Sequence, residues 1–558
     1  MEDTLGISRR DLLRWGIVIG GAAMLPGGLR PSLAHADDLP PSPHTDPFIL
    51  ELKPGQGIPP VARKVTPFNT QADPGICVNV DGTTAFHVSK PRVVPANTEF
   101  FLIHEKSMSH SFHPQLPNNI LWGYDGLIPG PTIVAKSGTP QLVRFVNDLP
   151  VNDPVGIGEP ISAIHRHGGF QAPQDDGYPL DTFCTGQSRD YFFPNRPAGG
   201  LLQNEHSTNW YHDHSIDITG QNVYRGLSGF YPYTNSFDTG DEGTGLHLPA
   251  NFYNGTPVGP FDIGLVFQDR QFNSEGYLVY NTFDHDGFIG DKFCVNGLIQ
   301  PYLKVQRRKY RFRFLNGSNA RVYQFFLSSG QPFVAIGTDS NLLPQPVTAQ
   351  SVRISPAERV DVVIDFTNYQ NNSEVFLVNR LQQTDGRKPN GLVSRGTPIL
   401  KFLVEGVVPT ADPSDVPATL LPVTEGPAQL LPQVKVQRRI KAERSNGAWV
   451  INGQFFDENR IIARPKRGEP EIWILESGGG WVHPFHVHLS EFFILSRDGK
   501  QPPPLERGRK DTVLIGGDVA RETRILIKFE EFTGRYVFHC HNIEHEDMRM
   551  MAQFEIQP

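Results

Sequence analysis

Residues 142–150 read LVRFVNDLP, a short run in which apolar and polar residues alternate before a polar turn. Similar stretches recur twice further along the chain, KYRFRFLNGSN at 309–319 and EIWILESGGG at 471–480. They occupy comparable places in successive segments, and each has the period of a strand, which is typical of a repeated structural unit. We therefore expect three copies of one β-sandwich.

Length and composition agree with this expectation. A single hydrophobic core stops growing at about 250 to 300 residues, whereas this chain has 558. It contains 54 Gly and 49 Pro among many short alternating runs, which favours strands and turns over long helices. The sequence thus predicts an all-β protein. The formal net charge is −8 and the basic residues are scattered, so the charge pattern gives no footprint for nucleic acid.

The N-terminus has the pattern of a processing segment. SRRDLLR at 8–14 precedes the apolar run WGIVIGGAAMLPGGL at 15–29 and then Ala34-His35-Ala36, a small-x-small cleavage pattern. The segment resembles a twin-arginine export signal. Its apolar run is short and broken by Gly and Pro, too poor to span a bilayer. We expect a periplasmic or secreted protein without a membrane-embedded part once mature.

The chain divides at turn-rich and Pro-rich stretches. A connector, VVPTADPSDVPATLLPVTEGP at 407–427, separates the second copy from the third, and the turn-rich TNSFDTGDEGTG at 234–245 separates the first from the second. The predicted organisation is a signal segment at 1–36, a first domain at 37–240, a second at 241–410, a linker at 411–427 and a third domain at 428–558.

Histidines are distributed unevenly. Of nineteen, eight form four His-x-His pairs: His165/His167, His212/His214, His486/His488 and His539/His541. On a strand, residues i and i+2 face the same side, so each pair presents two imidazoles to one place. Two pairs lie in the first copy and two in the third. If these copies pack face to face, the eight imidazoles suit a cluster of three metals, more than a zinc ion with four ligands could use.

The cysteines are few, namely Cys77, Cys184, Cys294 and Cys540. They cannot form a disulfide scaffold, although one bridge among the first three is open. Cys540 lies between His539 and His541 and so faces the opposite side of the strand. Its natural partners are His545, His483 and Met550, ten residues downstream. Two His, a thiolate and a weak thioether are the ligands of a blue-copper electron-transfer site.

The motifs HRHGG, WYHDH, HPFHVH and HCHNIEHEDMRM together resemble the copper-binding motifs of three-domain multicopper oxidases. The resemblance covers essentially the whole mature chain, including GYDGLIPGPTI at 123–133. HGGFQAPQDDGYP, ERGRKDTV and WVHPFHVH are most similar to bacterial spore-coat-type laccases and bilirubin oxidases. This resemblance implies three consecutive cupredoxin-like Greek-key domains, sandwiches or barrels, and four copper ions.

The resemblance also implies a division of ligands. The type 1 copper would take His483, Cys540, His545 and Met550; the type 2 copper would take His165 and His486; the type 3 pair would take His167, His212, His214, His488, His539 and His541. Spacing alone shows convergence of the eight cluster imidazoles and not this division. A single His-x-His pair is weak evidence for a metal, and HPFHVH alone would also suit zinc.

Three further residues are candidates for a role in the reaction. Asp176 and Glu546 match acids that supply or organise protons near the oxygen site in related laccases, and the reduction of dioxygen consumes protons in a buried place. Carboxylates in loops are more often simply solvated. Trp481, two residues before His483, is either a wall of the substrate site or a core indole.

The predicted activity is oxidation of phenols, aminophenols or linear tetrapyrroles at the type 1 copper, coupled to reduction of dioxygen to water at the cluster. The chain has only six Met, so it lacks a methionine-rich insert that would suit cuprous ion. Oxidation of cuprous or manganous ion is the alternative, and a copper-free structural or division accessory protein is a second one. The partners expected are a small reducing substrate and dioxygen, with the protein a monomer.

Overall fold

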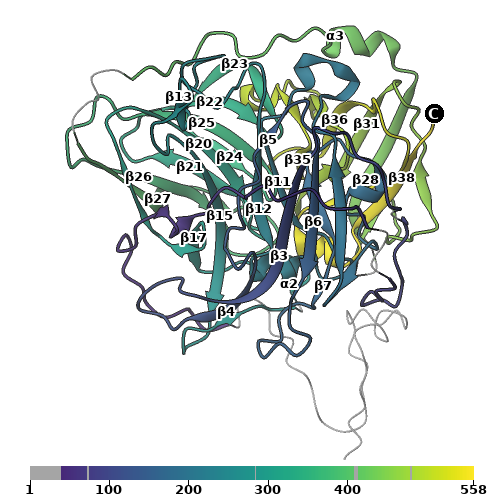
Figure 1. The fold of residues 1–558 in the computed structure, drawn as a ribbon, viewed down its shortest axis with the longest axis horizontal. Helices are drawn as coiled ribbons and strands as arrows, with labels where there is room; N and C mark the ends of the chain where they lie inside the picture. The colour runs from purple at the N-terminus through teal and green to yellow at the C-terminus, as the bar shows by residue number, and fades with distance from the viewer. Residues whose placement is uncertain are drawn as a thin grey trace, which may run out of the picture.

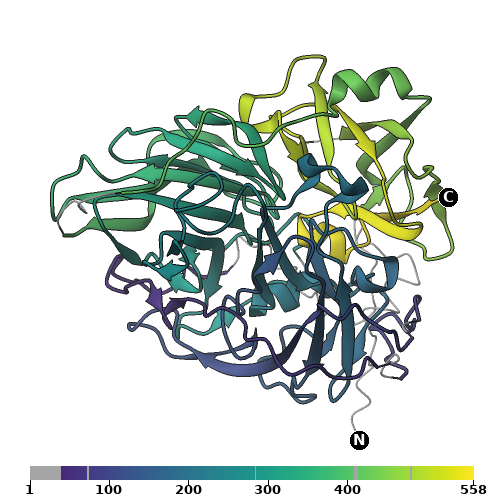
Figure 2. The same ribbon diagram turned by 45° about the horizontal axis from the view of Figure 1, so that its top comes forward.

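A computed structural model describes residues 39–71, 75–88, 90–282, 284–406, 412–445, 447–477 and 480–558. The predicted signal segment lies outside these residues. Three bodies of twisted sheets surround a common centre, and the purple and blue first part of the chain touches both the teal middle part and the yellow last part (Figures 1 and 2). Strands dominate the described residues, so the predicted all-β class is confirmed.

The first unit packs two four-stranded sheets with the orders β10-β6-β3-β4 and β5-β12-β11-β8. Aromatic residues from both sheets, among them Trp122, Phe145 and Tyr211, form one core. The strands are β3 (Glu99–His110), β4 (Asn119–Tyr124), β5 (Ala135–Lys136), β6 (Gln141–Asn147), β8 (Ile164–His167), β10 (Ser188–Phe193), β11 (Thr208–Asp213) and β12 (Ser228–Thr234).

The middle unit has the largest apolar core, built from residues such as Phe267, Phe314 and Phe402. One sheet has the order β18-β17-β15-β20-β25-β22-β23 with β16 beside β15, and the other β19-β27-β26-β21-β24. The strands are β15 (Asp262–Phe272), β16 (Leu278–Val279), β17 (Lys292–Val295), β18 (Leu298–Ile299), β19 (Tyr302–Val305), β20 (Lys309–Asn316), β21 (Tyr323–Leu327), β22 (Phe333–Thr338), β23 (Asn341–Ala349), β24 (Val352–Ile354), β25 (Arg359–Asp365), β26 (Glu374–Gln382) and β27 (Gly391–Val404).

The third unit repeats the design with sheets β29-β28-β31-β36-β33-β34 and β30-β38-β37-β32-β35. Its core contains Trp473, Phe538 and Phe554 together with Cys540 and Met550. The strands are β28 (Val436–Ser445), β29 (Ala448–Ile451), β30 (Ile461–Ala463), β31 (Pro470–Ser477), β32 (Val482–Val487), β33 (Phe492–Arg497), β34 (Arg509–Lys510), β35 (Thr512–Gly516), β36 (Glu522–Lys528), β37 (Gly534–Cys540) and β38 (Met551–Ile556).

Short elements complete the described chain. They are β1 (Lys53–Pro54), β2 (Gly57–Ile58), β7 (Ile161–Ser162), β9 (Phe183–Cys184), β13 (Phe252–Tyr253), β14 (Thr256–Pro257), α2 (Thr219–Arg225), α3 (Pro427–Leu430), α4 (Ile543–Asp547) and the 3-10 turns Pro173–Asp175, Ala198–Gly200, Leu202–Asn204, Leu431–Gln433 and Pro504–Glu506. No helix within the described ranges is both long and apolar enough to cross a bilayer.

The three similar stretches of sequence are equivalent strands. β6, β20 and β31 each pair in parallel with an earlier strand, namely β3, β15 and β28. Each pairs on its other side, antiparallel, with a later strand, namely β10, β25 and β36. The predicted internal repeat is therefore confirmed at the level of topology.

The connector packs against the middle unit. Leu420 and Leu421 are buried in the core of that unit, and Asp412 forms ion pairs with Arg308 and Lys309 at 2.9 and 3.1 Å. The predicted linker is therefore a packed segment in its described part. The domain boundaries stay predictions.

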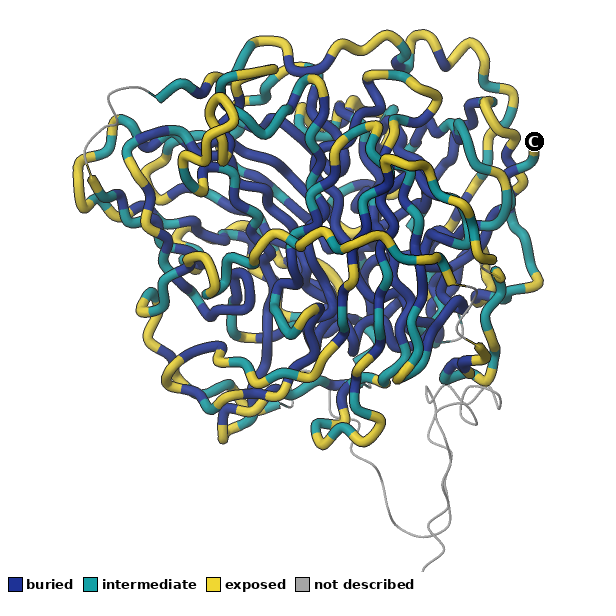
Figure 3. The backbone as a smooth tube through the Cα atoms, viewed as in Figure 1, coloured by how far each residue is buried: buried dark blue, intermediate teal, exposed yellow. Residues whose placement is uncertain are grey.

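Buried residues follow the sheets of the three units and the region between them, while exposed residues gather at loops on the periphery (Figure 3). A disulfide joins Cys77 to Cys184, which closes 107 residues of the first unit. Cys294 and Cys540 are buried free thiols. One of the three pairings that the sequence left open among the first three cysteines is thus present.

Candidate metal centres

Two antiparallel strand pairs position the four His-x-His pairs. In the first unit β11 lies beside β8, with His212 opposite His165. In the third unit β37 lies beside β32, with His539 opposite His486. The registers are the same, because the two units share one topology. The pairs therefore stand at matching places on the two units.

The eight imidazoles converge between the units. His167 stacks on His486 with ring centroids 3.7 Å apart, and His165 stacks on His488 at 3.9 Å. The Nε2 atom of His539 lies 3.2 Å from Nε2 of His488 and also 3.2 Å from Nε2 of His214. The whole set is at most 1% exposed: His165, His167, His212, His214, His486, His488, His539 and His541. This is the arrangement expected if the first and third units pack face to face.

Backbone carbonyls orient three of these rings. Nδ1 of His165, His212 and His486 donates to the carbonyl oxygens of Asp176, Asp213 and Asp511, at 2.6, 2.7 and 2.8 Å. The Nε2 atoms of the three rings are buried without a hydrogen-bond partner among the described residues. A ring with one nitrogen donating and the other nitrogen left as a lone pair is the form in which histidine ligates a metal.

Burial favours the neutral form of several imidazoles in this set. It lowers the pKa of His214 to about 4 and that of His486 to about 3. In His165 and His541 burial also lowers the pKa, with neighbouring imidazoles adding to the shift. Metal binding needs the neutral ring, so the site is prepared for a cation at ordinary pH.

Both predicted acids are buried against the imidazoles. Asp176 Oδ2 lies 2.7 Å from Nδ1 of His488, and Gln171 donates to Asp176 Oδ1 at 2.7 Å. Glu546, on α4, lies 3.1 Å from Nδ1 of His539 and 3.5 Å from Nδ1 of His214. The alternative of solvated loop carboxylates is wrong for both, since they are 1% and 2% exposed.

The pKa values of the two acids are shifted in opposite directions. Burial raises the pKa of Asp176 well above its usual range, against the opposing effects of Gln171 and Arg166. Burial alone would also raise the pKa of Glu546, but the imidazoles of His539 and His214 hold it well below its usual range.

A second site lies on the other face of β37. Cys540 Sγ is 3.5 Å from Nδ1 of His483 and 3.5 Å from Nδ1 of His545, and these two nitrogens are 3.2 Å apart. Burial raises the pKa of the Cys540 thiol and lowers that of His483 to about 3. Two ring nitrogens and a sulfur directed at one point form a soft donor set.

The three methionines near the C-terminus lie in different surroundings. Met550 is fully buried in the apolar cluster that contains Cys540, and its carbonyl accepts from the Cys540 N–H at 3.1 Å. Met551 belongs to another cluster, with Tyr178 and Val537. Met548 packs against the same cluster as Met550 but is only partly buried. Burial beside Cys540 supports Met550 among the three.

Trp481 is half-buried beside this second site. Its ring meets Trp449 edge-on at 5.2 Å, and Trp449 lies over His545 at 3.8 Å. Trp449 also donates from Nε1 to the carbonyl of His285. The sequence reasoning missed Trp449, because it lies 32 residues before Trp481 on β29 and nothing local marks it.

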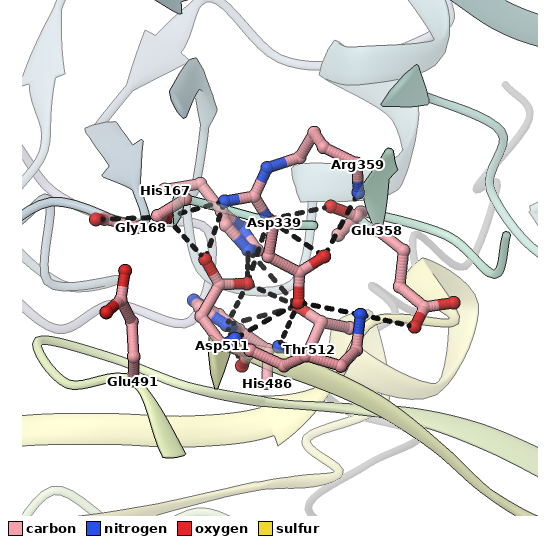
Figure 4. A network of polar contacts seen from close by, with 12 residues as sticks. His167, Gly168, Asp339, Glu358, Arg359, His486, Glu491, Asp511 and Thr512 are labelled. Carbon is pink, nitrogen blue, oxygen red and sulfur yellow. Dashed lines mark hydrogen bonds and ion pairs between the residues drawn. The ribbon is translucent and has the colours of Figure 1, made fainter. Parts of the chain in front are cut away.

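Asp511 was also missed, although it lies within ERGRKDTV. Its Oδ1 accepts from Nε2 of His167 at 3.0 Å, and Arg359 of the middle unit binds both of its carboxylate oxygens at 2.8 and 2.6 Å (Figure 4). Burial alone would raise the pKa of Asp511, but Arg359 and His167 hold it well below its usual range. The family resemblance drew attention to ERGRKDTV, but no local pattern in the sequence indicated a role for Asp511.

Comparison with known proteins identifies the family. Three multicopper oxidase family models match residues 107–233, 273–396 and 429–558. The chain belongs to the multicopper oxidase family and is an oxidoreductase with the cupredoxin-like, three-domain fold of that family. Membership implies copper as the metal for the donor sets described above.

Named relatives agree with this assignment. A bilirubin oxidase from Albifimbria verrucaria is 33% identical over 487 residues, covering 84% of this chain and 79% of the relative. A laccase from Bacillus subtilis is 31% identical over 522 residues, covering 84% and 96%. The crystal structure of a laccase from Pediococcus acidilactici is 25% identical with a TM-score of 0.71, covering 96% of this chain and 100% of that one.

Proposed function

We propose that this protein is a laccase-like oxidase with four copper ions per chain, which couples one-electron oxidation of small phenolic, aminophenolic or tetrapyrrole substrates to reduction of dioxygen to water. The observation that carries the proposal is the pair of donor sets joined by one strand. Eight buried imidazoles converge on one side of β37, and Cys540 faces the other side with His483 and His545.

The residues fit the metal. In the proposed assignment His483, Cys540, His545 and Met550 hold the type 1 ion, and His165 and His486 hold the type 2 ion. The type 3 pair is held by His167, His212, His214, His488, His539 and His541. Bound copper would supply single-electron transfer at the first site and the electrons and oxygen-binding positions for dioxygen reduction at the cluster.

The chain itself supplies the connection between the sites. Cys540 is covalently joined to His539 and, through one further peptide bond, to His541, so a continuous bonded path joins the two donor sets. Both His483 and His545 are buried. The substrate is proposed to approach at the His483 edge, because the half-buried Trp481 lies two residues before His483 and would form part of that wall.

Asp176 and Glu546 are proposed to hold and move protons beside the cluster. Each carboxylate lies close to an Nδ1 atom, Asp176 at 2.7 Å from that of His488 and Glu546 at 3.1 Å from that of His539. Tyr536 donates its hydroxyl proton to the carbonyl of Gln171, whose side chain binds Asp176. These contacts place ionisable groups next to the buried site, where protons are needed.

Oxidation of a metal ion is the second candidate. A hollow beside α4 is lined by Tyr280, Asp284, His285, Glu544, Asp547 and Met548, a set with the carboxylate and thioether donors that metal cations accept. Glu544, one of the lining residues, directly precedes His545 in the sequence, which favours an electron path from the hollow to the Cys540 site. A copper-free accessory protein has no observation in its favour.

The test is copper content followed by oxygen uptake. Purified, copper-loaded protein should hold four coppers per chain and be intensely blue from the Cys540 thiolate. Oxygen uptake is then compared across a phenol, an aminophenol, bilirubin, cuprous ion and manganous ion. A content of one or two coppers would contradict the cluster assignment, and uptake with the metal ions alone would select the second candidate.

We also propose export through the twin-arginine pathway, with the mature monomer in the periplasm or medium. The Cys77–Cys184 disulfide supports it, because structural disulfides persist in oxidising compartments. Changing Arg9 and Arg10 together to Lys should leave the protein in the cytoplasm, since a receptor reads the arginine pair and not simply its charge. Cell fractionation checks this, and normal export of the double variant would refute it.

A further inference from the structure

The middle unit contributes none of the paired histidines, yet its residue Arg359 reaches the cluster through Asp511. Arg359, the first residue of β25, is fully buried. Its Nη1 and Nη2 bind the two carboxylate oxygens of Asp511 in a fork at 2.8 and 2.6 Å. Asp511 belongs to the third unit, and it accepts from His167 of the first (Figure 4). One contact chain thus crosses all three units.

Every N–H group of the Arg359 guanidinium donates a hydrogen bond. Its Nε donates to the carbonyl of Thr208, Nη1 also donates to the carbonyl of Ala357, and Nη2 also donates to Ser340 Oγ, at 3.2, 3.0 and 2.8 Å. With the two bonds to Asp511, all five N–H donors of Arg359 are used. Thr208 begins β11, the strand that carries His212, so Arg359 is fixed to the same strand as a cluster imidazole.

Asp511 is held as firmly as Arg359. Ser340 Oγ and Thr512 Oγ1 donate to its carboxylate, both at 2.9 Å. Its own N–H donates to Asp339 Oδ2 at 3.1 Å, and Lys510 Nζ lies 3.0 Å from that oxygen. The carboxylate therefore has little freedom to turn away from His167.

Gly168 makes room for this network. A side chain at this position would have its Cβ 2.0 Å from Ser340 Oγ, 2.7 Å from Arg359 Nη2 and 2.8 Å from Asp511 Oδ2. The backbone next to His167 thus approaches the network more closely than any residue with a Cβ allows. The fit between HRHGG and the network is tight.

His167 is oriented differently from its neighbours. Its Nε2 donates to Asp511, and its Nδ1 is buried without a hydrogen-bond partner among the described residues. Six other cluster imidazoles meet a carbonyl or carboxylate oxygen through Nδ1 instead: His165, His212, His214, His486, His488 and His539. His167 therefore offers the opposite nitrogen to the cluster.

We propose that Arg359 is a positioning residue for the cluster: through Asp511 it keeps the proton of His167 on Nε2 and leaves Nδ1 as the nitrogen that faces the metals. An ionised carboxylate only accepts, so the ring nitrogen beside it must carry the proton. The middle unit, which supplies no cluster imidazole, thereby sets the tautomer of one. The statement about metals rests on the proposed function, whereas the statement about the tautomer does not.

Two variants and a matched control test the proposal. Asp511→Asn keeps the size of the side chain but introduces an amide that can donate to His167. Arg359→Lys keeps the buried positive charge but removes the fork. Arg321→Lys is the control, because Arg321 forms a similarly buried pair with Asp269 in the middle unit, with Nε 2.8 Å from Oδ2, and its hydrogen bonds go to Asp269, Gln383 and Gly290.

The first measurement uses copper-free full-length protein with nitrogen-15 in the histidine rings. The His167 signals, assigned by their loss in His167→Gln, should show the Nε2-protonated tautomer in wild type and in Arg321→Lys. Asp511→Asn should shift the population towards the Nδ1-protonated tautomer, with a smaller shift in Arg359→Lys. An unchanged tautomer in both variants would overturn the proposal.

The second measurement is copper binding by equilibrium dialysis. Contacts that orient metal-binding histidines are worth about 10- to 100-fold in metal affinity. We expect a loss of about that size at the cluster in Asp511→Asn and about tenfold in Arg359→Lys, with the blue absorption of the Cys540 site retained. A loss no larger than in Arg321→Lys would mean that the network only stabilises the fold.

The two measurements separate this inference from the proposed function. If wild type binds no copper at the eight imidazoles, the proposed function fails, while the tautomer experiment still decides the role of Arg359. If Asp511→Asn does not fold, Arg359→Lys remains measurable because it preserves the charge balance of the buried network.

Discussion

The C-terminal ends of β11 and β37 are equivalent positions in the first and third units, which share one topology. β11 runs antiparallel to β8 and β12, and β37 runs antiparallel to β32 and β38. In each copy two histidines flank one residue that faces the other side of the strand. That residue is Asp213 in the first unit and Cys540 in the third.

Their surroundings differ completely. Asp213 accepts from Ser162 Oγ at 3.0 Å, from Ser215 Oγ at 2.8 Å and from Asn222 Nδ2 at 3.1 Å. Cys540 instead meets His483 and His545. By strand register Ser162 is the counterpart of His483, since each lies three residues before the first histidine of its pair.

The difference shows that the two faces of the strand are independent. Both copies keep imidazoles on the face between the units, while the other face holds a polar hydrogen-bonded cluster in one copy and a sulfur and imidazole donor set in the other. The sheet tolerates either, because side chains on opposite faces share the backbone but not their packing.

Among the substitutions that test this comparison, Cys540→Ser should have the largest effect. Removing the thiolate should abolish the blue colour and substrate oxidation entirely, while about three of the four coppers stay bound, because the cluster imidazoles lie on the other face. Absorption spectroscopy, oxygen uptake and copper analysis check this. Cys294→Ser, at the other buried free thiol, should retain colour and activity. Retention of the blue band in Cys540→Ser would show that the thiol is not a ligand.

Asp213, the polar counterpart of Cys540, should contribute to the stability of the fold. Asp213→Ala removes the buried acceptor of the Ala163 and Ser215 N–H groups. The side chains of Ser162, Ser215 and Asn222 also lose a bond, but each keeps a second acceptor, Glu105 for Ser162 and the Ile161 carbonyl for the other two. Each unsatisfied buried donor costs about 1–3 kcal/mol, and partial relaxation should bring the total to roughly 2–4 kcal/mol. Urea unfolding of copper-free protein measures the change. Asp213→Asn, which keeps one acceptor oxygen, should lose less, and equal losses in the two variants would contradict this account.

A smaller effect concerns the axial position. Met550→Leu should raise the potential of the blue site, because a weak thioether donor stabilises the oxidised state. We expect a rise on the order of 60 mV, which is about a tenfold change in a one-electron equilibrium. Redox titration of the blue band is the measurement, with Met548→Leu and Met551→Leu as controls. A shift in either control without one in Met550→Leu would mean that the axial residue is misassigned.

The smallest effect is expected for the reverse substitution, in the first unit. Asp213→Cys places a thiol where the third unit has one, but Ser162 and Ile218 stand at the offsets of His483 and His545. Without imidazole partners the thiol should gather no further copper, so the content stays at four and the blue absorption is unchanged. A fifth copper with added blue absorption would show that the cysteine alone decides the site.

The strand with Cys540 was readable from sequence because its information is local. Period-2 alternation separates Cys540 from His539 and His541, and His545 and Met550 follow within ten residues. The repeated strands β6, β20 and β31 were readable for the same reason. Trp449 could not be found in this way, because its place over His545 depends on how β29 packs against α4.

The sequence by itself thus determined the strand class, the threefold repeat and which residues carry donor atoms. Only the tertiary structure decided how those donors are held. The tautomer of His167 depends on Asp511, 344 residues away, and on Arg359 from a unit without paired histidines. A hydrogen bond between units leaves no periodic trace in the chain, since it is set by how three distinct cores pack together and not by the spacing of residues along one strand.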